Sequence, residues 1–121
     1  MIYTSYFAAM RRMTDEQKSR CVCIALWPPG GVSIPIYINL APTRKILLDY
    51  KKNPDTKKYI QDYCFHVLPM LDPHKVYEYL DNKILLCYEK PEDFCHRHIV
   101  ADWFKAYGHE CEELKTCFLR Y

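Results

Sequence analysis

Three short apolar runs, separated by segments with helical spacing, constrain the fold of this chain more than any other feature. They cover residues 1–7, 21–27 and 83–88. The second run is continuously apolar, which is typical of a strand buried on both faces of a parallel sheet. Because helical crossovers return a chain to the same sheet, we expect these strands to be adjacent and parallel. The pattern predicts an α/β fold.

Boundary signals place the first helix and the segment that follows the second run. Thr14 and Gln17 have the spacing of a capping box, which predicts a short helix ending near residue 19. Residues 28–31, Pro-Pro-Gly-Gly, end the second apolar run. Residues 33–40 are apolar but contain Pro35, so we expect an edge strand or an extended loop there.

Residues 42–80 have the spacing of three helices, of which the first ends near residue 52. Asn53 and Pro54 are the expected N-cap and first residue of the next helix, and Asp72 and Pro73 are expected to open the third. The inward-facing residues of the middle helix are expected to be Tyr59, Tyr63, Phe65, Val67 and Leu68.

The last helix follows the third strand. Asp93 is its expected N-cap, which places Cys95 at the second helical position, and Gly108 is its expected C-terminal stop. Residues from 109 onward can add a short strand. The predicted fold is one domain over residues 1–121, with a mostly parallel sheet of about four strands and helices on both faces, a Rossmann-like three-layer arrangement.

Composition limits the class of protein. The 121 residues suffice for one domain, and half of them are hydrophobic, which is typical of a folded chain. The net charge of +2 argues against a dedicated electrostatic DNA binder. A cluster of lysines near two helix ends indicates a solvated face, and only secondarily a nucleic-acid surface: Lys45, Lys51, Lys52, Lys57 and Lys58.

Seven cysteines are scattered along the chain. The first residues lack the basic start and long apolar run of a signal peptide, and no run approaches the length of a membrane-spanning helix. We therefore expect reduced thiols in a cytoplasmic protein with no membrane partner.

Reactive side chains are concentrated in residues 85–98. An apolar strand ends at Glu89, a proline turn follows, and a helix begins with the thiol of Cys95, two imidazoles and the guanidinium of Arg97. In open α/β sheets, ligands bind beyond the carboxyl ends of the strands, near helix N-termini. The sequence therefore predicts the functional site in this segment.

Several segments together resemble the family called domain of unknown function 488 (DUF488). They are Tyr-Thr-Ser-Tyr-Phe at 3–7, Ile-Ala-Leu-Trp-Pro at 24–28, Leu-Ala-Pro at 40–42, and the Leu-Leu-Cys-Tyr-Glu and Phe-Cys-His-Arg parts of 85–98. The resemblance covers nearly the whole chain in order. It implies a small α/β protein of bacterial or phage type with a site around residues 85–98, and it implies no particular reaction.

Three residues of this segment are the candidate catalytic groups. Cys95 can form a thiolate near the helix N-terminus, His96 can act as its base, and Glu89 can orient that base. The alternative for Cys95 is a buried, inert thiol, because it precedes Ile99 by four residues on the apolar stripe of the helix. For Glu89 the alternative is a structural ion pair with Arg97.

Arg97 is the expected anion-binding group, acting with the helix N-terminus on a phosphate or carboxylate. An ion pair with Glu89, Glu92 or Asp93 is the structural alternative. The remaining candidates for ligand binding lie in or after the first two strands: Tyr3, Thr4, Ser5 and Trp27.

Zinc is an alternative, suggested by Cys87, Cys95, His96, His98, His109 and Cys111, but no metal site and no cofactor are predicted. The chain has no Cys-x-x-Cys pair, and Cys95 with His98 is a single i,i+3 pair without a matching partner pair. None of the three glycines opens a helix, so a dinucleotide bound in the Rossmann manner is not expected.

These features predict an intracellular enzyme that acts on a small anionic substrate such as a nucleotide or a nucleic-acid component. The alternative is a non-catalytic module that binds a nucleotide or a partner protein through the same crevice. The two differ in one respect, because an enzyme needs a reactive group exposed within reach of the anion.

Overall fold

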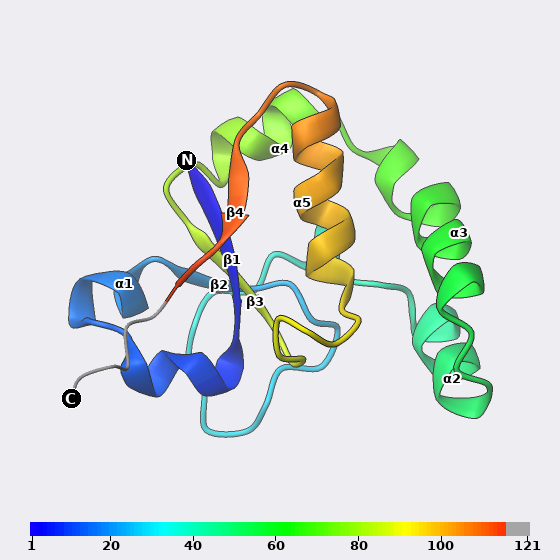
Figure 1. Ribbon diagram of the computed structural model, residues 1–121, viewed down its shortest axis with the longest axis horizontal. Helices are drawn as coiled ribbons and strands as arrows, with labels where there is room; N and C mark the ends of the chain where they lie inside the picture. The colour runs from blue at the N-terminus through cyan, green and yellow to red at the C-terminus, as the bar shows by residue number, and fades with distance from the viewer. Residues whose placement is uncertain (116–121) are drawn as a thin grey trace.

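The computed structural model describes residues 1–115 of the chain. Its centre is a sheet of four parallel strands in the order β2-β3-β1-β4 (Figure 1). The strands are β1 (Ile2–Tyr6), β2 (Cys21–Cys23), β3 (Ile84–Cys87) and β4 (Cys111–Glu113). Helices separate successive strands along the chain, so the predicted α/β class is confirmed.

The register of the sheet confirms the expected strand pairing. Ile84 of β3 lies opposite Tyr3 of β1 and opposite Cys21 of β2, in parallel register on both sides. The first and second apolar runs therefore flank the third run. The expected last strand is also present, since β4 pairs with β1 and places Cys111 opposite Ile2.

Strand β2 is shorter than the apolar run that predicts it. Pairing with β3 continues only to Ile24, whose N–H donates to the Leu86 carbonyl at 3.0 Å. On the outer edge of β2, the Cys23 N–H donates to the Pro35 carbonyl at 2.8 Å, and the Tyr37 N–H donates to the Cys23 carbonyl at 2.9 Å. Residues 33–37 thus form an extended edge segment as expected, with a parallel bridge between Cys23 and Ile36, whereas the last three residues of the predicted segment form a 3-10 helix, η2 (Ile38–Leu40).

The helices cover the two faces of the sheet unequally. Alternate residues of β3 point to opposite faces of the sheet. Leu85 and Cys87 belong to the larger core, whereas Ile84 and Leu86 pack in a smaller cluster with η1. In Figure 1, α5 lies against the strands and the α2–α3 pair lies beyond it. The helices are η1 (Phe7–Arg12), α1 (Asp15–Ser19), η2 (Ile38–Leu40), α2 (Arg44–Lys52), α3 (Thr56–His66), η3 (Leu68–Met70), α4 (Pro73–Tyr79) and α5 (His96–Ala106). None of the described helices is long and apolar enough to cross a membrane.

Of the four predicted N-caps, two are confirmed and two are wrong. Thr14 and Gln17 form a reciprocal capping box, and Asp72 accepts from the first backbone donors of α4. Asn53 does not cap α3, because its N–H still donates to the Asp49 carbonyl and closes α2. The cap of α3 is Asp55, whose carboxylate accepts from the Lys58 N–H at 3.1 Å.

Helix α5 begins two residues later than the sequence predicts. The Asp93 N–H donates to the Lys90 carbonyl in a turn, and the N-cap is Cys95, in extended conformation and without a side-chain cap bond. Gly108, at φ +86°, ends the helix as expected. The His109 N–H donates to the Phe104 carbonyl at 3.0 Å, which completes a Schellman motif.

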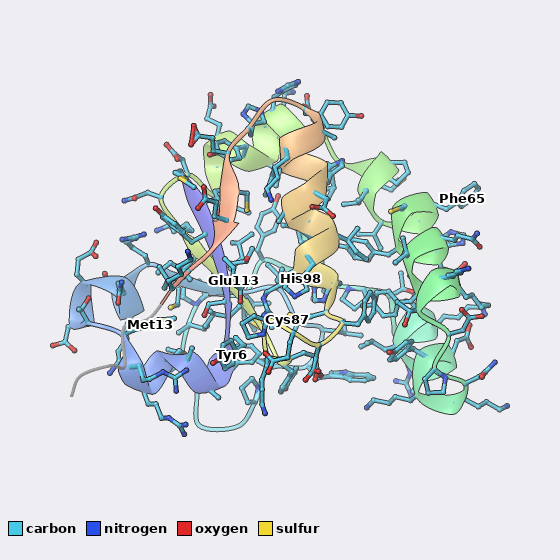
Figure 2. The ribbon with its side chains drawn as sticks, viewed as in Figure 1. Tyr6, Met13, Phe65, Cys87, His98 and Glu113 are labelled. Carbon is cyan, nitrogen blue, oxygen red and sulfur yellow. A yellow bond between two sulfur atoms is a disulfide. The ribbon has the colours of Figure 1, made fainter. Side chains whose placement is uncertain are left out.

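The expected inward position of Phe65 is wrong. Its side chain is 75% exposed and points away from the rest of the molecule at the end of α3 (Figure 2). Tyr59 and Tyr63 are buried as predicted, because they are four residues apart and share the face of α3 that packs on the core. Phe65 lies two residues beyond Tyr63, which places it on the opposite side of the helix.

Candidate functional site

A pocket of about 500 Å³ lies at the carboxyl ends of β2 and β3. This is the edge of an open α/β sheet at which ligands usually bind. The segments after the two strands, the start of α5 and the inner sides of α2 and α3 form its walls. The lining residues are Ala25, Leu26, Trp27, Pro42, Leu47, Tyr50, Lys51, Tyr59, Cys87, Tyr88, Glu89, Phe94, Cys95 and His96.

The structure brings four of the predicted site residues together at this pocket. They are Trp27, Glu89, Cys95 and His96. Trp27 is held from its backbone, because the Tyr88 hydroxyl donates to the Trp27 carbonyl. The ammonium group of Lys51 lies 5.3 Å from the centroid of the Trp27 ring, within the range of a cation–π contact.

The other predicted ligand-binding residues lie in the sheet and under α5. Tyr3 is half-buried and packs against the smaller core cluster. Thr4 and Ser5 are buried in β1. Arg97 is the largest fully buried side chain among the described residues, with 0% exposure. These four positions remain predictions for ligand binding, and the structure gives Thr4 and Arg97 other contacts.

The guanidinium of Arg97 is held by three groups. Nε and Nη2 donate to the two carboxylate oxygens of Glu113 at 3.0 and 2.8 Å. Nη1 donates to the backbone carbonyl of Glu89 at 2.6 Å and approaches the Cys87 Sγ at 3.3 Å. Glu89 and Arg97 are therefore in direct contact as expected, but through the backbone oxygen. The carboxylate partner of Arg97 is Glu113.

Sequence reasoning missed Glu113 as part of this network. It lies on β4 directly opposite Thr4, whose hydroxyl donates to Glu113 Oε1 at 2.7 Å. The available signal was alternation along the strand, since residues two apart face the same side and Cys111 is buried. A carboxylate two residues after a buried cysteine would face α5 once β4 was placed beside β1.

His96 is buried and fixed in one orientation. Its Nε2 lies 2.8 Å from the Ile24 carbonyl oxygen. Because a carbonyl oxygen only accepts, Nε2 carries the proton, and the lone pair of Nδ1 points toward Cys95 Sγ at 3.9 Å. Burial lowers the pKa of His96 to about 4, and the charge of Arg97 also lowers it, against the opposing effect of the Ile24 hydrogen bond. The imidazole is neutral at neutral pH.

The described cysteines comprise a pair at the pocket, three buried thiols (Cys21, Cys23 and Cys111) and the exposed thiol of Cys64. Cys87 and Cys95 form a disulfide, so the prediction of reduced thiols is wrong for this pair. Burial raises the pKa of Cys21 to about 11 and that of Cys111 to about 12, which keeps both protonated. Cys64 is exposed and free. Cys117 lies outside the described residues.

Comparison with known proteins gives one family. A family model described as DUF488-N3a, the active DUF488-N3 subclade, matches residues 6–108. No curated protein and no solved structure matches the chain. The matched range contains β2, β3, α5 and all the residues that line the pocket.

Proposed function

The chain belongs to the DUF488 family, and we propose that it is an enzyme acting on a small anionic substrate with a planar ring, such as a nucleotide or a nucleic-acid component. The pocket at the ends of β2 and β3 supports this proposal, because aromatic rings line it together with Lys51, Glu89, His96 and the Cys87–Cys95 pair. The matching subclade is described as active, which favours an enzyme over a binding module.

Aromatic rings supply a surface on which a planar ring can stack. Trp27, Tyr50, Tyr88 and Phe94 all line the pocket. Trp27 is 43% exposed and Tyr88 is 48% exposed, so both keep ring surface for a ligand. Stacking of a base on an aromatic side chain contributes about 1–3 kcal/mol. The volume of the pocket lies within the range of about 300–1,000 Å³ that is typical of small-molecule sites.

Lys51 is the cation best placed for the anionic group of a ligand. It lies at the pocket beside Trp27 and is exposed. Arg97 was the expected anion-binding group, but its guanidinium is fully buried and in bidentate contact with Glu113. We therefore assign the anion to Lys51 and give Arg97 a positioning role at the end of β3.

The candidate reactive groups of the pocket lie between the end of β3 and the start of α5. The neutral imidazole of His96 presents an acceptor at Nδ1 beside Cys95. A base with a pKa near 4 takes up little proton at neutral pH, so His96 serves as an acceptor that orients its neighbours. Glu89 is exposed at the pocket and is the candidate acid/base group.

Binding is tested by calorimetry with adenosine and adenosine monophosphate. The monophosphate should bind more tightly, by up to about fivefold, since an exposed ion pair contributes up to about 1 kcal/mol. Lys51→Gln should remove that difference, and Lys52→Gln, its neighbour on α2, should leave it unchanged. Equal binding of both ligands to the native protein and to Lys51→Gln would contradict the role of Lys51.

Catalysis is tested by incubating the native protein with a panel of nucleoside monophosphates and analysing the products by mass spectrometry. We expect conversion of at least one ligand that binds, and loss of this conversion in Glu89→Gln with binding retained. Recovery of every bound ligand unchanged would instead support a non-catalytic module that uses the same pocket.

A further inference from the structure

We propose that, in its reduced form, the Cys87–Cys95 pair binds one zinc ion together with Nδ1 of His96. The three residues come from the end of β3, the N-cap of α5 and the first residue of α5. Their ligand atoms all lie within 4.8 Å of one another. Two thiolates and an imidazole form a donor set that binds zinc in preference to harder cations.

The distance between the Cys95 sulfur and the His96 nitrogen suits a tetrahedral ion once the S–S bond is reduced and the two sulfur atoms separate. Zn–S bonds of about 2.3 Å and Zn–N bonds of about 2.0–2.1 Å place a sulfur and a nitrogen ligand about 3.6 Å apart. Cys95 Sγ and His96 Nδ1 lie 3.9 Å apart in the structure. The Cα atoms of Cys87 and Cys95 are 7.2 Å apart, beyond the range of about 4.4–6.8 Å that most disulfides span. That separation leaves room for an ion between the two reduced sulfur atoms.

Outer contacts already orient two of the three ligands. The Ile24 carbonyl accepts from His96 Nε2–H, which fixes the ring and directs the Nδ1 lone pair to the sulfur atoms. Arg97 Nη1 lies 3.3 Å from Cys87 Sγ and can donate to a thiolate there. Zinc-bound histidines commonly have such a partner on the second ring nitrogen, and it raises metal affinity.

Charge balance also favours a divalent cation. Cys87, Cys95 and His96 are all buried, at 1%, 6% and 5% exposure. Two buried thiolates would repel each other, and Arg97, the cation that contacts Cys87, is already balanced by Glu113. A zinc ion with two thiolates and a neutral imidazole carries no net charge, so the buried site avoids an uncompensated ion.

The geometry leaves one coordination position open. All three ligands line the pocket, so the fourth position of a tetrahedral ion faces it. Structural zinc sites are closed by four protein ligands, whereas catalytic sites combine three protein ligands with an open position. This inference deepens the proposed function, because it gives Cys95 and His96 the role of ligands at the reactive end of the pocket.

Zinc binding is tested on the full chain, reduced with a phosphine and supplied with zinc or cobalt. We expect one metal ion per chain, and for cobalt the intense visible bands of a tetrahedral ion with a thiolate-to-cobalt band in the near ultraviolet. Cys95→Ser and His96→Gln should weaken binding by at least tenfold. The matched controls Cys64→Ser and His66→Gln, both at exposed positions of α3, should bind as the native protein does.

Oxidation provides a second control on the unaltered chain. Diamide takes two electrons and two protons from the Cys87–Cys95 dithiol, forms the S–S bond and becomes the hydrazine. The oxidised chain should not bind the metal until it is reduced again.

X-ray absorption at the zinc edge of the native, reduced chain should show two sulfur ligands and one imidazole ligand. Because this measurement needs no variant, it tests the proposal even if a variant fails to fold. No binding by the reduced chain, a sulfur count other than two, or binding that persists in folded Cys95→Ser would overturn the proposal. None of these measurements uses a nucleotide, so their failure is distinct from failure of the substrate proposal.

Discussion

Arg97 and Glu113 form a bidentate ion pair between α5 and the sheet, with Nε–Oε1 and Nη2–Oε2 distances of 3.0 and 2.8 Å. The pair joins the first turn of α5 to β4, at the edge of the sheet opposite β2. The same guanidinium holds the backbone oxygen of Glu89 and approaches Cys87. One buried cation therefore positions the end of β3, where the reactive side chains of the pocket begin.

Loss of Glu113 should destabilise the protein markedly. Glu113→Gln leaves the fully buried guanidinium of Arg97 without its counter-charge, which should cost about 2–3 kcal/mol of unfolding free energy in urea. The matched control is Glu112→Gln, an exposed neighbour on the same strand, which should change stability by less than about 0.5 kcal/mol. Equal effects of the two substitutions would show that the ion pair contributes nothing measurable.

The two partners should also be coupled. Arg97→Met in the native background removes the two guanidinium donors of the Glu113 carboxylate, which still accepts from the Thr4 hydroxyl, whereas Arg97→Met in the Glu113→Gln background removes a cation that has already lost its counter-charge. We expect the second loss of stability to be smaller than the first by at least 1 kcal/mol in a double-mutant cycle. Additive losses would indicate that the two side chains act independently.

Stability should depend on pH through His96. Its pKa is about 4 in the folded chain and near 6.5 when exposed, so between these values the unfolded state binds the proton first. Neutral His96 therefore contributes about 3 kcal/mol to the unfolding free energy above pH 6.5. This contribution is lost as the pH falls toward 4. Urea melts from pH 7 to 4 should show a shallower loss for His96→Gln than for His66→Gln. Parallel curves for the two variants would contradict a buried neutral imidazole.

A buried hydrogen bond should make Tyr63 sensitive to loss of its hydroxyl. Tyr63 is fully buried, and its hydroxyl donates to the Leu40 carbonyl at 2.6 Å. Tyr63→Phe leaves that carbonyl unpaired in the core and should cost about 1–3 kcal/mol in thermal or urea melts. Tyr79→Phe, at a position that is 73% exposed, should have little effect. A neutral Tyr63→Phe would mean that another group satisfies the carbonyl.

The N-cap of α3 gives a test of local structure. Asp55→Ala should cost about 1 kcal/mol, because the Lys58 N–H loses its acceptor. Asn53→Ala should have a smaller effect, since the contact of Asn53 is through its backbone N–H, which alanine keeps. If Asn53→Ala destabilised the protein more than Asp55→Ala in the same urea melts, the N-cap would be Asn53, as the sequence alone predicts.

Local patterns predicted much of the fold. Apolar runs located β1, β2 and β3, and the signals at Thr14, Asp72 and Gly108 marked helix ends, because each depends on residues close in sequence. The N-caps of α3 and α5 were predicted two residues too early in the sequence. In both cases a neighbouring turn uses the backbone donor of the expected cap, and composition alone does not reveal that competition.

The contacts that build the site are long-range, so local patterns could not supply them. Glu113 reaches Arg97 only because β4 pairs with β1, and Tyr50 reaches the pocket only because α2 packs beyond the ends of the strands. Cys95 was recognised from the sequence as a candidate reactive residue, whereas Cys87 was not. The two cysteines meet only because of the conformation of the turn between β3 and α5. Their spacing of eight residues in the sequence does not determine that conformation.

The most direct test of the pocket as a ligand site uses its tryptophan. The chain has two tryptophans, Trp27 at the pocket and Trp103 on α5. In Trp103→Phe, titration with adenosine monophosphate should quench the remaining Trp27 fluorescence in a saturable way, after correction for nucleotide absorbance. In Trp27→Phe, the fluorescence of Trp103 should stay constant. Constant fluorescence of Trp27 up to millimolar nucleotide, or a response confined to Trp103, would contradict the account.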